Sequence, residues 1–219
     1  MSVALSVFFA AISASLLYFY LIHRNEEKLN FNKLFEYRYS KNCMILAGAA
    51  FAAGMAACIC DVFIHKMSVL HTVTDVVMMA WLVVLAGIDY KEQIIPNKLI
   101  VAGFCVGFLV NALRVAMTPI EWKQVLLGAF VGAGVCGGIL FIIAIVVKTA
   151  LGMGDVKLFT VLGFVYGLTS TYSILLVSIF VMAILSIVLL IAKKVTRKTA
   201  IPMAPFVAIG FAINILIGM

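Results

Sequence analysis

A stretch without any charged residue, Val125–Val147, is the feature of this sequence that most narrows its possible folds. At a rise of about 1.5 Å per residue, a helix of this length crosses a hydrocarbon layer of about 30 Å. In lipid, every main-chain N–H and C=O group needs a partner within the protein, and a helix supplies these partners internally. The stretch is therefore expected to be a transmembrane helix.

Apolar stretches fill most of the rest of the chain. Of its 219 residues, 65% are hydrophobic and 11% are charged, which leaves too few polar side chains to cover a water-soluble globule. The runs lack the alternating pattern of membrane β-strands, so an all-α, polytopic transmembrane bundle of about eight spans is predicted. The other expected spans are Val3–Ile22, Met44–Ile64, Val69–Ile88, Leu99–Met117, Val156–Leu168, Tyr172–Ala192 and Ile201–Gly218.

Charged residues lie mainly between these stretches and predict the orientation of the chain. Lys and Arg concentrate in alternate connections, which the positive-inside rule assigns to the cytoplasm, so both termini are expected outside. No Lys or Arg precedes the first stretch, which is expected to remain as a helix rather than act as a secretory signal. Basic connections that face anionic lipid explain the net charge of +7 without a nucleic-acid partner. These connections hold Arg24, Lys28, Lys33, Arg38, Lys41, Lys91, Lys98, Lys148, Lys193, Lys194, Arg197 and Lys198.

A single membrane-embedded domain over residues 1–219 accounts for this pattern. The longest polar segment, residues 23–42, has room only for a short basic cytoplasmic loop. The five cysteines form no C-x-x-C pair, so neither a zinc site nor a disulfide framework is indicated, and no metal or cofactor is expected. Two G-x-x-x-G motifs predict close packing of the Val125–Val147 helix against a neighbour, at Gly128/Gly132 and Gly134/Gly138.

The chain has nine carboxylates, and four of them lie in or beside apolar stretches, where charge is costly and usually functional. Asp89 follows Val69–Ile88 and Asp155 precedes Val156–Leu168, so with eight spans both reach the cytoplasmic face. Two carboxylates at one site repel each other when both are ionised, so one keeps a proton while the other acts as a base. Such a pair can activate water and protonate a leaving amine. The residues leave open which aspartate takes which role.

Short motifs adjoin the two aspartates. Gly152-Met153-Gly154 precedes Asp155, and glycine permits close approach of a substrate. Taken alone, this motif also fits an ordinary helix start, where the helix dipole stabilises an aspartate. Asp89 is followed by Ile95-Pro96-Asn97, in which Pro96 is expected to end the connecting loop before the next helix.

A third motif, Ile201–Phe206 (I-P-M-A-P-F), contains two prolines that free main-chain groups near the cytoplasmic face. Together the three motifs resemble the type IV prepilin peptidases, whose pattern joins an aspartate with a downstream I-P-N, a G-x-G-D-x-K-L and an I-P-x-x-P-F. The resemblance covers most of residues 80–212. The first two motifs of this chain are Asp89–Leu99 (D-Y-K-E-Q-I-I-P-N-K-L) and Gly152–Leu158 (G-M-G-D-V-K-L).

The resemblance implies a membrane aspartyl endopeptidase that removes a short basic leader from pilin or pseudopilin precursors. Cleavage would follow a glycine at the cytoplasmic boundary of the plasma membrane, so prepilin leaders and membrane lipid are the implied partners. Asp89 and Asp155 take the positions of the two essential aspartates of the family. Supporting roles at the active site are implied for Pro96, Asn97, Gly152, Gly154, Lys157, Pro202 and Pro205.

The chain departs from the family pattern at two places. Many bacterial members carry a large cytoplasmic insertion after the first helix, with paired C-x-x-C motifs linked to zinc and to N-methylation of the mature pilin. Only residues 23–42 occupy that position here, so cleavage without methyl transfer is expected. Ala204 stands where many members have glycine, which is expected to alter packing more than chemistry.

Three other interpretations were weighed. A presenilin-like intramembrane protease also uses G-x-G-D, but with a Y-D pair and a P-A-L element, whereas this chain has Asp89-Tyr90 and no P-A-L. A proton-coupled transporter would spread a relay of carboxylates through the bilayer, drawn from Asp61, Asp75, Asp89 and Asp155. A metal site would use residues whose spacing matches no strong pattern, namely Cys58, Cys60, Asp61, His65, His71 and Asp75.

Overall fold

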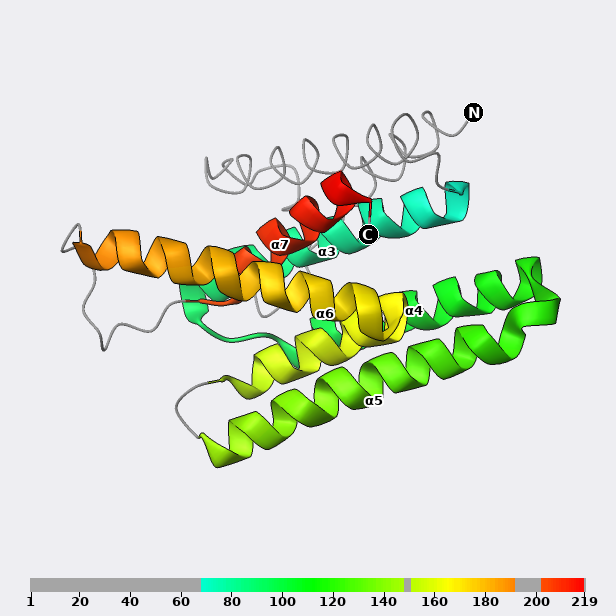
Figure 1. Ribbon diagram of the computed structural model, residues 1–219, viewed down its shortest axis with the longest axis horizontal. Coiled ribbons are helices and arrows are strands. Elements are labelled where there is room, and N and C mark those ends of the chain that lie inside the picture. Colours follow the sequence, from blue (N-terminus) through cyan, green and yellow to red (C-terminus); the bar gives the residue numbers. More distant parts are fainter. Residues whose placement is uncertain (1–67, 148–150, 192–201, 219) are drawn as a thin grey trace, which may run out of the picture. The chain divides into compact units, whose positions relative to one another are not determined.

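The computed structural model describes residues 68–147, 151–191 and 202–218. Regular structure within these ranges is helical throughout, which confirms the all-α prediction for this part of the chain (Figure 1). The expected spans Val3–Ile22 and Met44–Ile64 and the basic loop at 23–42 lie outside the described residues, so eight spans and an outside N-terminus stay predictions. The helices are α3 (Val69–Glu92), α4 (Asn97–Met117), the 3-10 helix η3 (Pro119–Glu121), α5 (Trp122–Val146), α6 (Met153–Ile191) and α7 (Ala204–Ile217).

Helices long and apolar enough to cross a membrane number four among the described residues: Val69–Tyr90, Asn97–Met117, Pro119–Val146 and Met153–Val188. Large aromatic side chains on α4, α5 and α6 are exposed, for example Phe108 (71%) and Phe180 (67%), as a lipid-facing surface requires. α7 has 14 residues, so it is shorter than the span expected over Ile201–Gly218 and measures roughly 21 Å. These helices agree with a multi-pass membrane protein.

Two compact units divide the chain between Val84 and Leu85, within α3. In the first unit, the described part of α3 buries Met78 and Leu82 completely. Asp75 is buried on the same helix, and its Oδ2 lies 2.9 Å from Nδ1 of His71, one turn earlier. The end of α3 and all later helices belong to the second unit.

α3 ends shortly after Asp89. Gln93 has a left-handed φ of 53°, and its N–H donates to the Asp89 carbonyl oxygen at 2.8 Å, a common way to end a helix. Pro96 has an extended backbone (φ −66°, ψ 129°), and α4 starts at the next residue. The loop therefore ends at Pro96, as the I-P-N motif predicted.

α6 contains a break at Gly167, whose φ of 77° and ψ of −176° are accessible essentially to glycine alone. The break separates residues 153–166 from residues 168–191 and agrees with the two expected stretches, Val156–Leu168 and Tyr172–Ala192. In Figure 1 the yellow-green first part of α6 runs beside α5, and the orange second part turns back from it. We refer to the two parts as α6 first part and α6 second part.

Side chains of α4 bind main-chain carbonyl groups next to this break. Asn111 Nδ2 donates to the Phe164 carbonyl oxygen at 2.8 Å, and Arg114 Nη1 donates to that of Val165 at 2.6 Å. In an unbroken helix, these two carbonyl groups would accept hydrogen bonds from N–H groups that follow Gly167. The backbone leaves the helix at Gly167, so the carbonyl groups need other donors. α4 therefore satisfies polar groups that the break exposes, as a membrane interior demands.

Glycine brings α5 and the first part of α6 into main-chain contact. A Cβ on Gly132 would overlap the Gly163 carbonyl oxygen, and one on Gly163 would overlap that of Gly132. At Gly128, Gly134 and Gly138 an added Cβ would meet no described atom within 4 Å. Among the described residues, the face of α5 that meets α6 carries Gly132 and Gly137, so close packing is confirmed at Gly132 and stays a prediction for Gly134/Gly138.

α7 packs against α6. The rings of Tyr166 and Phe211 lie 5.4 Å apart, and Asn214 Nδ2 donates to Ser173 Oγ at 2.9 Å. Gly210 lies so close to Ser178 that its hydroxyl would overlap a Cβ there. These contacts hold α7 on α6 and fix where its first residue lies.

Candidate active site

Asp89 lies in the last turn but one of α3 and is only 6% exposed. Its Oδ2 accepts a hydrogen bond of 2.9 Å from the main-chain N–H of Ala204, the first residue of α7. The two residues are 115 positions apart, so this bond joins the first motif to the third. A buried carboxylate needs such a donor, because burial without one costs several kcal/mol.

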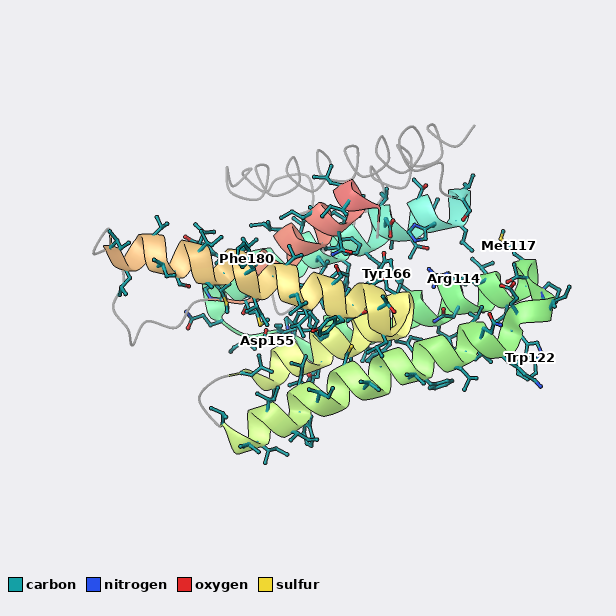
Figure 2. All side chains as sticks on the ribbon, viewed as in Figure 1. Arg114, Met117, Trp122, Asp155, Tyr166 and Phe180 are labelled. Carbon is teal, nitrogen blue, oxygen red and sulfur yellow. The ribbon has the colours of Figure 1, made fainter. Side chains whose placement is uncertain are left out.

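Asp155 lies in the first turn of α6 and is partly buried (Figure 2). Its carboxylate accepts a hydrogen bond from the Gly152 main-chain N–H, and its own N–H donates to the Gly152 carbonyl oxygen at 3.1 Å. A Cβ on Gly152 would lie 3.2 Å from Asp155 Oδ2, closer than such atoms usually approach. The G-x-G-D segment thus starts a helix and lets the main chain hold the aspartate.

Asp89 and Asp155 come from different helices and interact through their charges. The Asp89 carboxylate repels that of Asp155, so the two groups lie within range of direct electrostatic interaction. The structure therefore brings the two motif aspartates into one site.

The I-P-N segment touches the G-x-G-D segment beside this pair. A Cβ on Gly154 would lie 3.0 Å from Cβ of Ile95, so glycine lets the connection after α3 approach α6 closely. The Lys157 ammonium group donates to Asn97 Oδ1 at 2.8 Å. These contacts fasten the start of α4 to the first turns of α6.

The residues expected to support the site differ in what they contact. Gly152 contacts Asp155 directly, whereas Gly154 contacts the loop. Lys157 was expected to support Asp155, but the contact it makes is with Asn97. The three prolines lie at helix starts: Pro96 before α4, and Pro202 and Pro205 on either side of Ala204.

Two motif residues that were not expected to support the site join its segments, namely Ile95 and Ala204. Ala204 acts through its main chain, which the identity of the side chain does not reveal. One signal was present in the sequence: a non-proline residue just before Pro205, at a helix start, keeps an N–H that the helix cannot use.

Other residues weighed for function lie elsewhere. Asp75, one member of the transporter relay, is paired with His71 in the first unit, and Asp61 lies outside the described residues. Within residues 68–147, 151–191 and 202–218, no group of three His, Cys, Asp or Glu side chains could hold a metal ion. The other metal ligands considered, Cys58, Cys60 and His65, lie outside these ranges.

Known proteins match close to two thirds of the chain. The chain is 30% identical over 146 residues to the prepilin leader peptidase/N-methyltransferase of Bacillus subtilis, covering 65% of this chain and 55% of that protein. It is 33% identical over 136 residues to the protein of the same name from Xanthomonas campestris pv. campestris, covering 62% and 46%. The chain spans about half the length of the curated relatives it matches. No solved structure matches it significantly.

The sequence profile of the type IV leader peptidase family matches residues 76–187, about half of the chain. This range contains Asp89, Asp155 and the segments that join them, and it agrees with the resemblance drawn from the motifs. The chain therefore belongs to the type IV leader peptidase family.

Proposed function

We propose that this chain is a membrane aspartyl endopeptidase that cleaves the basic leader peptide from type IV prepilin-like precursors. Asp89 and Asp155 form its catalytic pair. The observation that carries the proposal is the interaction of these two carboxylates, each held by a main-chain N–H: that of Ala204 for Asp89 and that of Gly152 for Asp155. Relatives named prepilin leader peptidase/N-methyltransferase match 65% and 62% of the chain and support the substrate class.

The pair can hydrolyse a peptide bond without a net change in its own proton count. The ionised aspartate takes a proton from a water molecule held between the two side chains, and the hydroxide attacks the carbonyl carbon. The protonated aspartate donates a hydrogen bond to the carbonyl oxygen and then protonates the leaving amine as the C–N bond breaks. One proton has been gained and one released, so the pair again holds a single proton after the products leave.

The cytoplasmic face is proposed because basic residues flank both aspartates in the sequence. Lys91 and Lys98 follow Asp89, and Lys148 precedes Asp155, as the positive-inside rule expects of cytoplasmic connections. Methyl transfer is left out of the proposal, since residues 23–42 contain no C-x-x-C pair. The proposed activity is therefore cleavage alone.

The test uses the purified chain in lipid with a prepilin-like substrate whose basic leader ends in glycine. The wild-type protein should release the leader, and the mass of the new N-terminus should show no added methyl group. Asp89→Asn and Asp155→Asn should each lower kcat by about a thousandfold or more, since general acid–base catalysis contributes up to about 10⁴-fold. Wild-type rates in a well-folded Asp89→Asn protein would rule out the pair. Cleavage of unrelated membrane helices but not of prepilins would favour the presenilin-like alternative.

A further inference from the structure

The start of α7 has no capping side chain of its own. Its N-cap residue, Met203, is helical in backbone angle (φ −86°, ψ −33°) and makes no side-chain hydrogen bond to the helix. Pro205, in the first turn, has no N–H. The N–H groups of Phe206 and Val207 donate to the Met203 carbonyl oxygen at 3.0 and 3.2 Å. The N–H of Ala204 instead leaves the helix and reaches Asp89.

This bond is shielded from solvent at both ends, because Ala204 is completely buried and Asp89 is 6% exposed. A hydrogen bond to a charged group is stronger in such surroundings than in water. The N-terminus of α7 also favours a negative charge, whereas the C-terminal end of α3, which carries Asp89, disfavours one. The start of α7 therefore offsets the unfavourable place of Asp89 on its own helix.

We infer that the main-chain N–H of Ala204 is a positioning group for Asp89, which holds Oδ2 and restricts rotation of the carboxylate in the catalytic pair. This role rests on the proposed function. It gives the I-P-x-x-P-F motif a physical purpose: Pro205 lies in the first turn of α7, where a helix does not need its N–H, and the N–H of the residue before it is used for the aspartate. The side chain at position 204 has no part in the bond, so Ala204→Gly should keep it.

The bond can be removed by replacing the Ala204 amide with an ester, through incorporation of L-lactic acid at position 204 of the full chain. The ester also makes the Met203 carbonyl oxygen a weaker acceptor for the N–H groups of Phe206 and Val207, so the control must weaken a bond to the same oxygen. Loss of a hydrogen bond to a charged group should lower kcat by about tenfold to a hundredfold, with little change in KM. An ester at Val207, which loses a bond inside α7, serves as the control and should keep kcat within about threefold. An unchanged kcat for the position-204 ester would overturn the inference.

A second measurement separates this inference from the proposed function. In the ¹⁵N-alanine-labelled full chain, the Ala204 amide resonance, assigned through its loss in Ala204→Gly, should shift strongly in Asp89→Leu and much less in Asp155→Leu. No response to Asp89→Leu would overturn the inference even if prepilins are cleaved. A clear response in a protein that cleaves no prepilin would leave the contact standing and reject the proposed function.

Discussion

The interface between α5 and the first part of α6 and the site at the ends of α3, α6 and α7 both depend on glycine, but for different reasons. At the interface, Gly132 and Gly163 let two helix backbones touch. At the site, Gly152 supplies a main-chain N–H to Asp155 and leaves room for its carboxylate. The first contact concerns packing and the second concerns chemistry. Substitutions in the two regions should therefore affect different measured quantities.

The largest effect is expected from Gly132→Ala, which should disrupt the packing of α5 against the first part of α6. The new Cβ would overlap the Gly163 carbonyl oxygen, so the helices must separate, and overpacking of this kind lowers the free energy of unfolding by about 1–3 kcal/mol or more. Reversible unfolding in detergent measures the change. Gly134→Ala is the matched control, because its Cβ meets no described atom within 4 Å. It should raise stability by about 0.5–1 kcal/mol, as alanine does inside a helix.

On the site side, Gly152→Ala should lower the rate of cleavage rather than the stability. Its Cβ would lie 3.2 Å from Asp155 Oδ2, so the carboxylate must shift by a few tenths of an ångström while no helix packing changes. We expect kcat to fall by roughly tenfold, since small misplacements of catalytic groups are costly. The free energy of unfolding should change by less than about 1 kcal/mol. A large loss of stability with an unchanged kcat in Gly152→Ala would show that this glycine, like Gly132, serves packing rather than the site.

A smaller effect is expected at the contact between Asn97 and Lys157, which fastens α4 to α6 beside the site. The bond is exposed, so its contribution should be about 0.5–1.5 kcal/mol. A double-mutant cycle with Asn97→Leu and Lys157→Met, read out as both unfolding free energy and kcat/KM, measures this coupling directly. Additive effects in both readouts would show that the contact holds neither the fold nor the site.

The apolar stretches predicted the described helices well because lipid restricts the possibilities so strongly. Val69–Ile88 and Leu99–Met117 correspond closely to α3 and α4. The break at Gly167 lies near the end of the predicted stretch Val156–Leu168, whereas residues 169–171, between the two predicted stretches, are helical. The extent of α7 was not predicted, since hydrophobicity alone does not show that the helix starts only after Pro202 and Met203.

Residue types alone show neither the hydrogen bonds that the main chain makes nor which face of a helix meets its neighbour. The G-x-x-x-G spacing identified glycines on α5, but whether Gly132 or Gly134 meets α6 depends on how the helix is turned about its axis. The motifs identified both aspartates, whereas the donor to Asp89 is a main-chain N–H that any residue except proline carries. Ala204 was accordingly interpreted as a packing residue.

The central claim, that Asp89 and Asp155 act on one water molecule as a unit, is tested most directly by the rate of prepilin cleavage in the double variant. With enzyme in excess over a labelled substrate, single-turnover rates are compared for Asp89→Asn, Asp155→Asn and the protein carrying both substitutions. Residues that act as a unit are strongly non-additive, so the double variant should cleave within about threefold of the slower single variant. Losses that multiply in the double variant would contradict the claim and indicate two independent contributions.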